Sequence, residues 1–169
     1  MSKISTKMSK MLNDQFGQEL YAANLYLSMS SYFKTQNLEG FSNFFLVQSG
    51  EEHMHSMKIF KYLHDVESSL EMPAIAKPAT TFKSIRHAFE VTLQKEKENS
   101  LSINELVKLS LKENDYATHT FLQWFITEQV EEEASINRIL EQIIMIGSNT
   151  SALFMMDKDL GQRQKVEQE

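Results

Sequence analysis

The sequence predicts an all-α protein: a four-helix bundle with one long crossover between its second and third helices, followed by a short fifth helix. Three observations predict it. Four stretches repeat apolar residues at alternating steps of three and four, which is the spacing of one helix face. The 169 residues include only 5 Gly and 2 Pro, and both prolines lie between the second and third stretches. Alternating β-branched runs, which would indicate strands, are few.

The first two helices are expected at roughly 6–34 and 38–66. Ser5 or Thr6 would cap the first and Asn37 the second, because short polar side chains accept hydrogen bonds from unpaired amides. The turn between these helices is so short that they must run antiparallel.

The segment 67–81 has no helical period and contains Met72-Pro73 and Lys77-Pro78. At about 3.3 Å per residue it covers roughly 40 to 50 Å, the length of a helix of about 28 residues. It can therefore travel the full bundle and make the second and third helices parallel, as in bundles with one long crossover.

The last two long helices are expected at roughly 82–112 and 115–146. Their expected N-caps are Thr80 or Thr81 and Asn114. Gly147 would end the fourth helix, because a residue past a helix end often needs the left-handed conformation.

A short apolar stretch, 152–156, predicts a fifth helix of about three turns. Such a helix is not stable alone, and its apolar face would be exposed on a monomer, so we expect other subunits to bury it. We assign 1–161 to one domain and expect 162–169 to be a disordered tail.

Metal-binding side chains interrupt all four apolar stripes near their middle. They are Glu19, Glu52, His55, Glu96, Gln129 and Glu132. In an antiparallel hairpin, facing residues have numbers that sum to about twice the centre of the turn, roughly 72 to 74 for the first pair of helices and 225 to 229 for the second. Glu19 and Glu52 sum to 71, and Glu96 sums to 225 with Gln129 and to 228 with Glu132. Both hairpins therefore place these residues at one height inside the bundle.

Buried carboxylates repel one another and resist ionisation unless cations neutralise them. Carboxylate oxygens and imidazole nitrogens bind iron, manganese and zinc. The di-iron pattern of such bundles is Glu, Glu-x-x-His, Glu and Glu-x-x-His. Here Gln129 and Glu132 stand where the second Glu-x-x-His would be. We infer a two-metal site whose second ion is held less firmly, which favours passage of oxidised iron over a permanent cofactor.

Composition excludes several function classes. The 41% hydrophobic content suits one domain with a sizeable core, and a net charge of -6 without a basic tail argues against nucleic acid as a partner. No apolar run approaches about 20 residues, and the opening lacks the apolar core of a secretion signal. We therefore expect a cytoplasmic protein with no membrane partner. The absence of Cys excludes disulfides and thiolate metal sites.

Four motifs together resemble non-haem bacterial ferritin over about residues 8–160. They are QELYAANLY around Glu19, GEEHMH around Glu52 and His55, Glu96 in the third helix, and FLQWFITEQVEEE in the fourth. The resemblance implies a ferritin-like bundle that oxidises Fe(II) with dioxygen or hydrogen peroxide. It also implies a hollow homo-oligomeric shell of twenty-four subunits that stores ferric mineral, with the fifth helix at its fourfold axis.

The resemblance implies a role for each candidate residue. Those that match the first iron site are Glu19, Glu52 and His55. Those that match the second are Glu52, Glu96 and Gln129, with Glu132 nearby. Those that match a third, exit-side iron site are Glu51, Glu128 and Glu131. Tyr26 matches the tyrosine beside the di-iron centre and is counted among the catalytic residues.

Haem is not expected. Haem-binding relatives usually have Met directly after the ligand glutamate of the second helix, where this chain has His53. Their last helix also supplies a second ligand His, which this chain lacks. His53 could ligate iron.

Three alternatives to an iron-storage function stay open. The first is a di-metal peroxidase, oxygenase or manganese catalase. The second is a DNA-protecting mini-ferritin, against which the complete internal site argues. The third is a helical interaction protein whose polar layer only specifies pairing.

Overall fold

The computed structural model describes residues 4–164, which form five α-helices and no strands. In chain order the helices are α1 (Thr6–Thr35), α2 (Glu39–Asp65), α3 (Ile85–Lys112), α4 (Tyr116–Ile146) and α5 (Thr150–Leu160). The predicted all-α bundle is confirmed, and the ends of the four long helices lie within three residues of those expected. None of the described helices is both long enough and apolar enough to cross a membrane.

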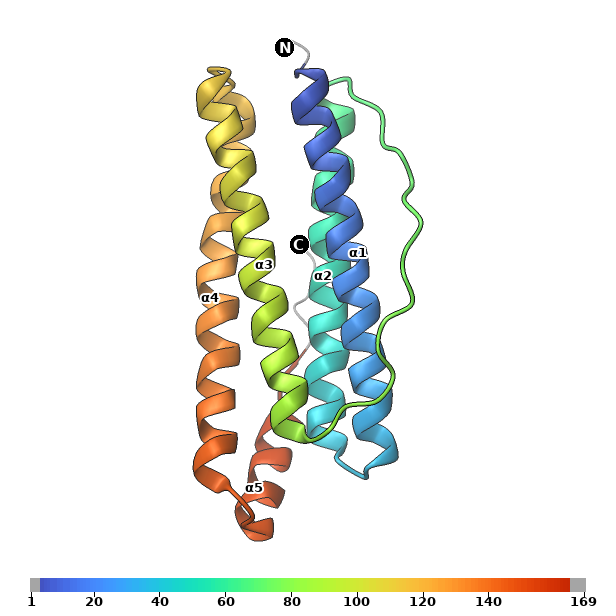
Figure 1. The fold of residues 1–169 in the computed structure, drawn as a ribbon, viewed down its shortest axis with the longest axis vertical. Coiled ribbons are helices and arrows are strands. Elements are labelled where there is room, and N and C mark those ends of the chain that lie inside the picture. The colour runs from blue at the N-terminus through green and yellow to red at the C-terminus, as the bar shows by residue number, and fades with distance from the viewer. Residues whose placement is uncertain (1–3, 165–169) are drawn as a thin grey trace.

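The four long helices pack as two antiparallel hairpins, α1 with α2 and α3 with α4 (Figure 1). The segment between α2 and α3 runs along the outside of α1, so that α2 and α3 point the same way, as expected from its length (Figure 1). The Tyr32 hydroxyl donates to the Phe82 carbonyl at 3.0 Å and ties this segment to α1. Gly17 permits its close approach, because a Cβ there would lie 3.1 Å from Pro73 Cγ.

Two of the expected N-caps, Asn37 and Asn114, instead lie in the turns that follow α1 and α3. Their φ angles are 57° and 55°, in the left-handed region that asparagine tolerates better than most residues. The N-cap of α2 is Leu38, which supplies no side-chain hydrogen bond. The N-cap of α4 is Asp115, whose carboxylate accepts from the Thr118 amide at 3.0 Å.

The start of α3 also differs from the prediction. Neither Thr80 nor Thr81 caps it; the hydroxyl of Ser84 does, and the helix begins three residues later than expected. The predicted N-cap of α1 and the predicted end of α4 are both confirmed. Ser5 caps α1 through its side chain, and Gly147 ends α4 with a φ of 56°.

A side chain from α5 supplies the missing cap of α2. The Phe41 amide donates to Asp157 Oδ1 at 3.0 Å. Gly40 allows this approach, because a Cβ there would lie 1.5 Å from the Asp157 carbonyl oxygen. Met156 of α5 is buried in the apolar cluster that also contains Phe41. The helix that we expected other subunits to bury is therefore docked partly on its own bundle.

Substituting Gly40 by alanine is expected to displace α5 from α2, because the clash is with backbone and no flexible side chain can relieve it. The cost should be roughly 1 to 3 kcal/mol. Thermal melting and limited proteolysis of the C-terminal segment would measure it. Gly50→Ala, in the same helix, is the control: its Cβ would meet no atom within 4 Å, and it should stabilise by about 1 kcal/mol. Unchanged protease resistance in Gly40→Ala would contradict the docking.

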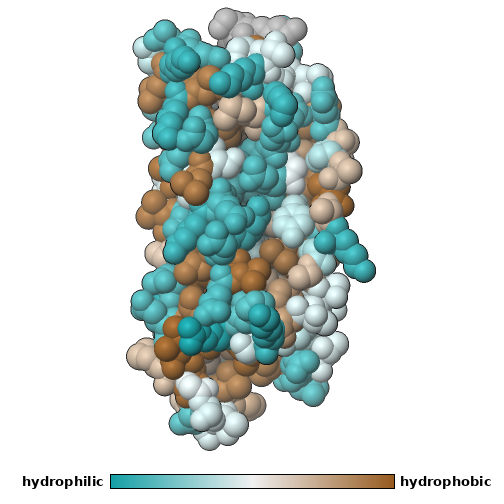
Figure 2. All heavy atoms as spheres, in the orientation of Figure 1, coloured by the Kyte–Doolittle hydropathy of each residue, from teal (hydrophilic) through white to brown (hydrophobic). Residues whose placement is uncertain are grey.

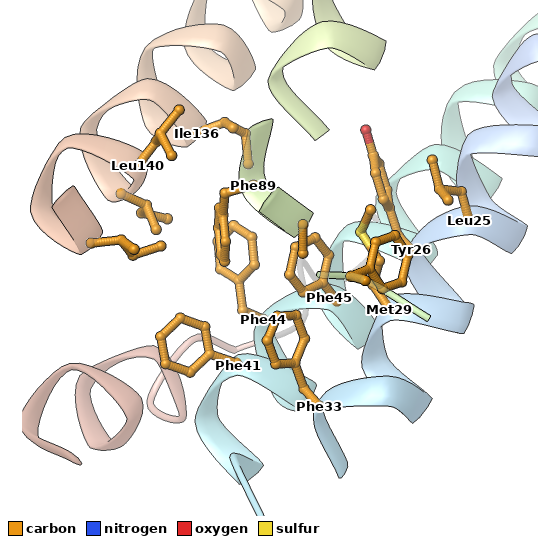
Figure 3. Packing of buried hydrophobic residues seen from close by; sticks show 14 of the residues in the cluster. Leu25, Tyr26, Met29, Phe33, Phe41, Phe44, Phe45, Phe89, Ile136 and Leu140 are labelled. Carbon is orange, nitrogen blue, oxygen red and sulfur yellow. The ribbon is translucent and has the colours of Figure 1, made fainter. Parts of the chain in front are cut away.

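Two apolar clusters fill the ends of the bundle, and a polar layer lies between them. In the cluster near the α1–α2 turn, the rings of Phe33 and Phe45 stack with centroids 5.4 Å apart (Figure 3). Leu12 and Phe125 belong to the cluster at the other end. The buried residues of the polar layer include Gln15, Glu19, Gln48, Glu52, His55, Glu96, Asn99 and Gln129. Their common height agrees with the expectation from residue numbers.

Candidate metal centre

Three buried side chains from α1 and α2 bring their ligand atoms together. One atom from each of Glu19, Glu52 and His55 lies within 4.8 Å of the others. His55 Nδ1 is 3.5 Å from Glu52 Oε2 and 3.9 Å from Glu19 Oε2. Glu52 and His55 share one face of α2 because they are three residues apart. The residues expected at the first iron site therefore meet, with Glu19 opposite the α2 pair.

A second group joins α2 to α3 and α4. Ligand atoms of Glu52, Glu96 and Glu132 also lie within 4.8 Å of one another, so that Glu52 belongs to both groups. His55 Nε2 is 4.0 Å from Glu132 Oε1. The Tyr26 hydroxyl donates to Glu96 Oε1, while its ring packs in the apolar cluster with the oxygen pointing away from the other rings (Figure 3). A carboxylate shared in this way can bridge two cations.

Gln129 faces the same layer, but its amide bonds to neighbouring protein groups. Its Nε2 donates to Glu96 Oε2 at 3.2 Å, and its Oε1 accepts from Asn99 at 3.2 Å. In this arrangement Gln129 orients Glu96. Glu132, by contrast, keeps one buried oxygen without a partner, so it offers the freer ligand on α4.

Two residues that were not among the predicted ligands connect the carboxylates. Gln15 donates to Glu19 at 2.6 Å, and Asn99 donates to the other oxygen of Glu19 at 3.4 Å. Gln15 also donates to Asn99, and the Ser102 hydroxyl donates back to Gln15 Oε1 at 2.6 Å. Gln15 and Asn99 both occupy positions of the apolar stripes. A polar residue at such a position was the signal that could have identified them.

Burial makes the carboxyl groups reluctant to ionise. It is the main cause of a raised pKa at Glu19, Glu52, Glu96 and Glu132. The pKa of Glu96 rises to about 7, and neighbouring carboxylates add to the effect of burial on the pKa of Glu52. Burial also lowers the pKa of His55 to about 4. The imidazole is therefore neutral near neutral pH and keeps a lone pair for a metal.

The buried atoms that lack hydrogen-bond partners are largely those that a metal would use. Among the described residues, seven buried side-chain atoms have no partner, and five of them belong to Glu52, His55 and Glu132. Such atoms are costly to bury. Divalent cations would supply partners for them and offset the repulsion between carboxylates. Carboxylates with one imidazole form a donor set that suits iron, manganese or zinc.

The three residues expected at a third iron site line one open depression. Glu51, Glu128 and Glu131 border this depression, which has a volume of about 1070 Å³ and extends to Glu132 of the buried centre. Within the described part of the chain, the two groups with ligand atoms inside 4.8 Å do not include these three. Glu51 pairs instead with Arg163, whose Nη2 lies 2.7 Å from Glu51 Oε2. The third iron site stays a prediction.

Comparison with known proteins agrees with this geometry. The family model for the ferritin-like domain matches residues 9–146. The chain is 40% identical over 158 residues to a probable bacterial non-heme ferritin-like protein of Haemophilus influenzae, covering 94% of this chain and 96% of that one. It is 39% identical over 155 residues to a bacterial non-heme ferritin of Campylobacter jejuni, covering 92% and 93%.

The fold is also similar to that of solved structures. An open pore ferritin from the hyperthermophilic archaeon Archaeoglobus fulgidus superposes with a TM-score of 0.95 at 43% identity, over 96% of this chain and 100% of that chain. The similarity therefore extends over the whole bundle.

Proposed function

This chain belongs to the ferritin family, and on that premise we propose that its buried polar layer is the ferroxidase centre of an iron-storage protein. The protein oxidises Fe(II), its substrate, to Fe(III) and stores iron. The observation that carries the site assignment is that Glu52 is shared by two groups of buried ligands. Dioxygen or hydrogen peroxide would accept the electrons.

In the proposed centre, each side chain has a separate task. Glu19 and His55 would bind one Fe(II), Glu96 and Glu132 the other, and Glu52 would bind both. Metal ligands bind in their deprotonated forms, so the carboxyl groups would release protons as Fe(II) enters. Tyr26 would hold Glu96 in place through its hydroxyl.

Gln129 makes the two iron positions unequal. It offers a neutral amide where a symmetric centre would have the carboxylate of a second Glu-x-x-His, and that amide is already bonded to Glu96 and Asn99. We infer that the second ion is held less firmly, which favours release of the oxidised pair into a store.

A hollow shell of twenty-four copies is the proposed container for ferric mineral. Large apolar side chains at the α5 end support assembly: Phe154 is 71% exposed, Met155 67% and Met145 79%. Hydrophilic residues cover much of the face in Figure 2, with hydrophobic ones between them, including at the lower end where α5 lies. Neighbouring subunits would remove these side chains from water. Light scattering after size exclusion would count the subunits. A cytoplasmic location stays a prediction.

Aerobic titration with Fe(II) tests the function. We expect rapid oxidation of about two Fe(II) per chain, followed by mineral growth inside a large discrete particle that stays soluble. His55→Ala should lose the rapid phase, since it removes the only imidazole of the centre. Absorbance of Fe(III) and particle size would be measured together. Oxidation of the first equivalents without any mineral would favour a di-metal peroxidase or oxygenase instead.

A further inference from the structure

The chain beyond α5 returns along α2 and places a cation in the depression beside the buried centre. Asn43 Nδ2 donates to the Arg163 carbonyl at 2.9 Å and to the Gly161 carbonyl at 3.4 Å. The Arg163 guanidinium lies 4.6 Å from the centroid of the Phe44 ring, and its Nη2 donates to Glu51 at 2.7 Å. Both the backbone and the side chain of Arg163 are therefore held against α2.

Glu51 is the carboxylate through which this cation acts. Its side chain is only 14% exposed, and it borders the depression together with Glu128, Glu131 and Glu132. The pKa of Glu128 is raised by burial and then by the charges of Glu131 and Glu51, so these groups interact electrostatically. A guanidinium at Glu51 therefore neutralises part of an acidic cluster that borders the ferroxidase centre.

The ion pair between Arg163 and Glu51 has features that allow another cation to displace Arg163. One nitrogen of Arg163 bonds to Glu51, while Nη1 is buried without a hydrogen-bond partner. A buried donor without a partner weakens the bound state of the segment. A divalent cation carries twice the charge and can take ligands from several carboxylates at once. Iron can therefore compete with Arg163 for Glu51.

We propose that Arg163 is a tethered cation that occupies the Glu51 position of the acidic depression, and that iron passing between this depression and the buried centre displaces it. The proposal rests on the proposed ferroxidase function. Arg163 is then a positioning residue that acts through Glu51. By keeping the third iron position weak, it favours onward movement of iron over accumulation there.

Zn(II) tests the proposal without any turnover, because it does not change oxidation state. Trp124 is the only tryptophan; its ring centroid lies 5.2 Å from that of His55, and it borders the depression. Its fluorescence therefore reports on both places, and calorimetry counts the ions. We expect two tight Zn(II) per chain and a weaker third. Arg163→Gln should tighten only the third, by roughly three- to tenfold.

Arg138→Gln is the matched control. Arg138 is exposed and borders the same depression, and the substitution removes the same charge. The affinity for the third Zn(II) should stay as in the wild type. Equal tightening in both variants would overturn the proposal, because it would reveal a general charge effect. An unchanged affinity for the third Zn(II) in Arg163→Gln would overturn it as well.

Two further variants separate the ion pair from folding effects. Asn43→Ala frees the backbone of the segment but keeps Arg163, and it should also tighten binding of the third Zn(II). Adding Glu51→Gln to Arg163→Gln should abolish the gain. If the wild type did not bind two Zn(II) tightly, that result would count against the ferroxidase centre itself. The two proposals therefore fail by different observations.

Discussion

Replacing Glu52 by glutamine is expected to remove rapid Fe(II) oxidation and yet leave the metal-free protein at least as stable as the wild type. The amide keeps the volume of the side chain but cannot serve as the charged bridge between two ions. The rate of the rapid phase should fall by roughly 100-fold or more. In the metal-free protein, burial and the charges of neighbouring carboxylates disfavour an ionised Glu52, and a neutral amide does not carry that penalty.

The measurement pairs stopped-flow oxidation with thermal melting in the presence and absence of Zn(II). The wild type should gain about 2.7 kcal/mol at a Zn(II) concentration one hundred times the Kd, and Glu52→Gln should lose most of this gain. Glu98→Gln, which changes an exposed glutamate of α3, is the control and should match the wild type in both assays. A Glu52→Gln protein that oxidises Fe(II) at the normal rate would show that Glu52 does not bridge the ions.

Helical periodicity was sufficient to predict the four long helices, because the apolar stripe that defines a helix in the sequence is the stripe that is buried in the bundle. Helix starts were harder to predict. An asparagine before a helix can serve as an N-cap or as the left-handed residue of the preceding turn. Asn37 and Asn114 take the second role, and only the geometry of the two hairpin turns decides between them. The crossover is anchored to α1 through Tyr32 and Phe82, and α3 begins only after that contact.

The buried ligands could be predicted because they interrupt apolar stripes at matching heights. Glu19, Glu52, His55 and Glu96 all lie in the polar layer. The bond between Arg163 and Glu51 joins residues 112 positions apart in the sequence. No periodicity relates them, and we had expected a disordered tail from residue 162. The structure describes residues 162–164, while 165–169 lie outside the described residues. The tail as a whole stays a prediction.

In the metal-free protein, the melting temperature is expected to fall as the pH rises from about 4.5 to about 7. Burial raises the pKa of Glu96 from 4.5 to about 7. The protonated form is therefore the one that stabilises the fold. This contribution is complete below the unfolded pKa and is lost as the pH rises through the folded pKa. The shift corresponds to roughly 3 kcal/mol.

Three other carboxyl groups act in the same direction as Glu96, because burial also raises the pKa of Glu19, Glu52 and Glu132. His55 opposes them. Its pKa is lowered from 6.5 to about 4, so its contribution is present above 6.5 and is lost as the pH falls toward 4. One opposing group against four leaves a net loss of stability with rising pH.

Zn(II) should reverse this slope, because its ligands bind deprotonated and binding therefore strengthens as the pH rises. The difference in melting temperature between the zinc-bound and metal-free protein should widen across the same pH range. Melting curves at constant ionic strength would measure it. Glu132→Gln should flatten the metal-free slope by removing one buried carboxyl group, whereas Glu98→Gln should leave it unchanged. If the metal-free melting temperature rose steadily over this range, the carboxyl groups would be ionising without penalty, and cations would not be needed to stabilise the polar layer.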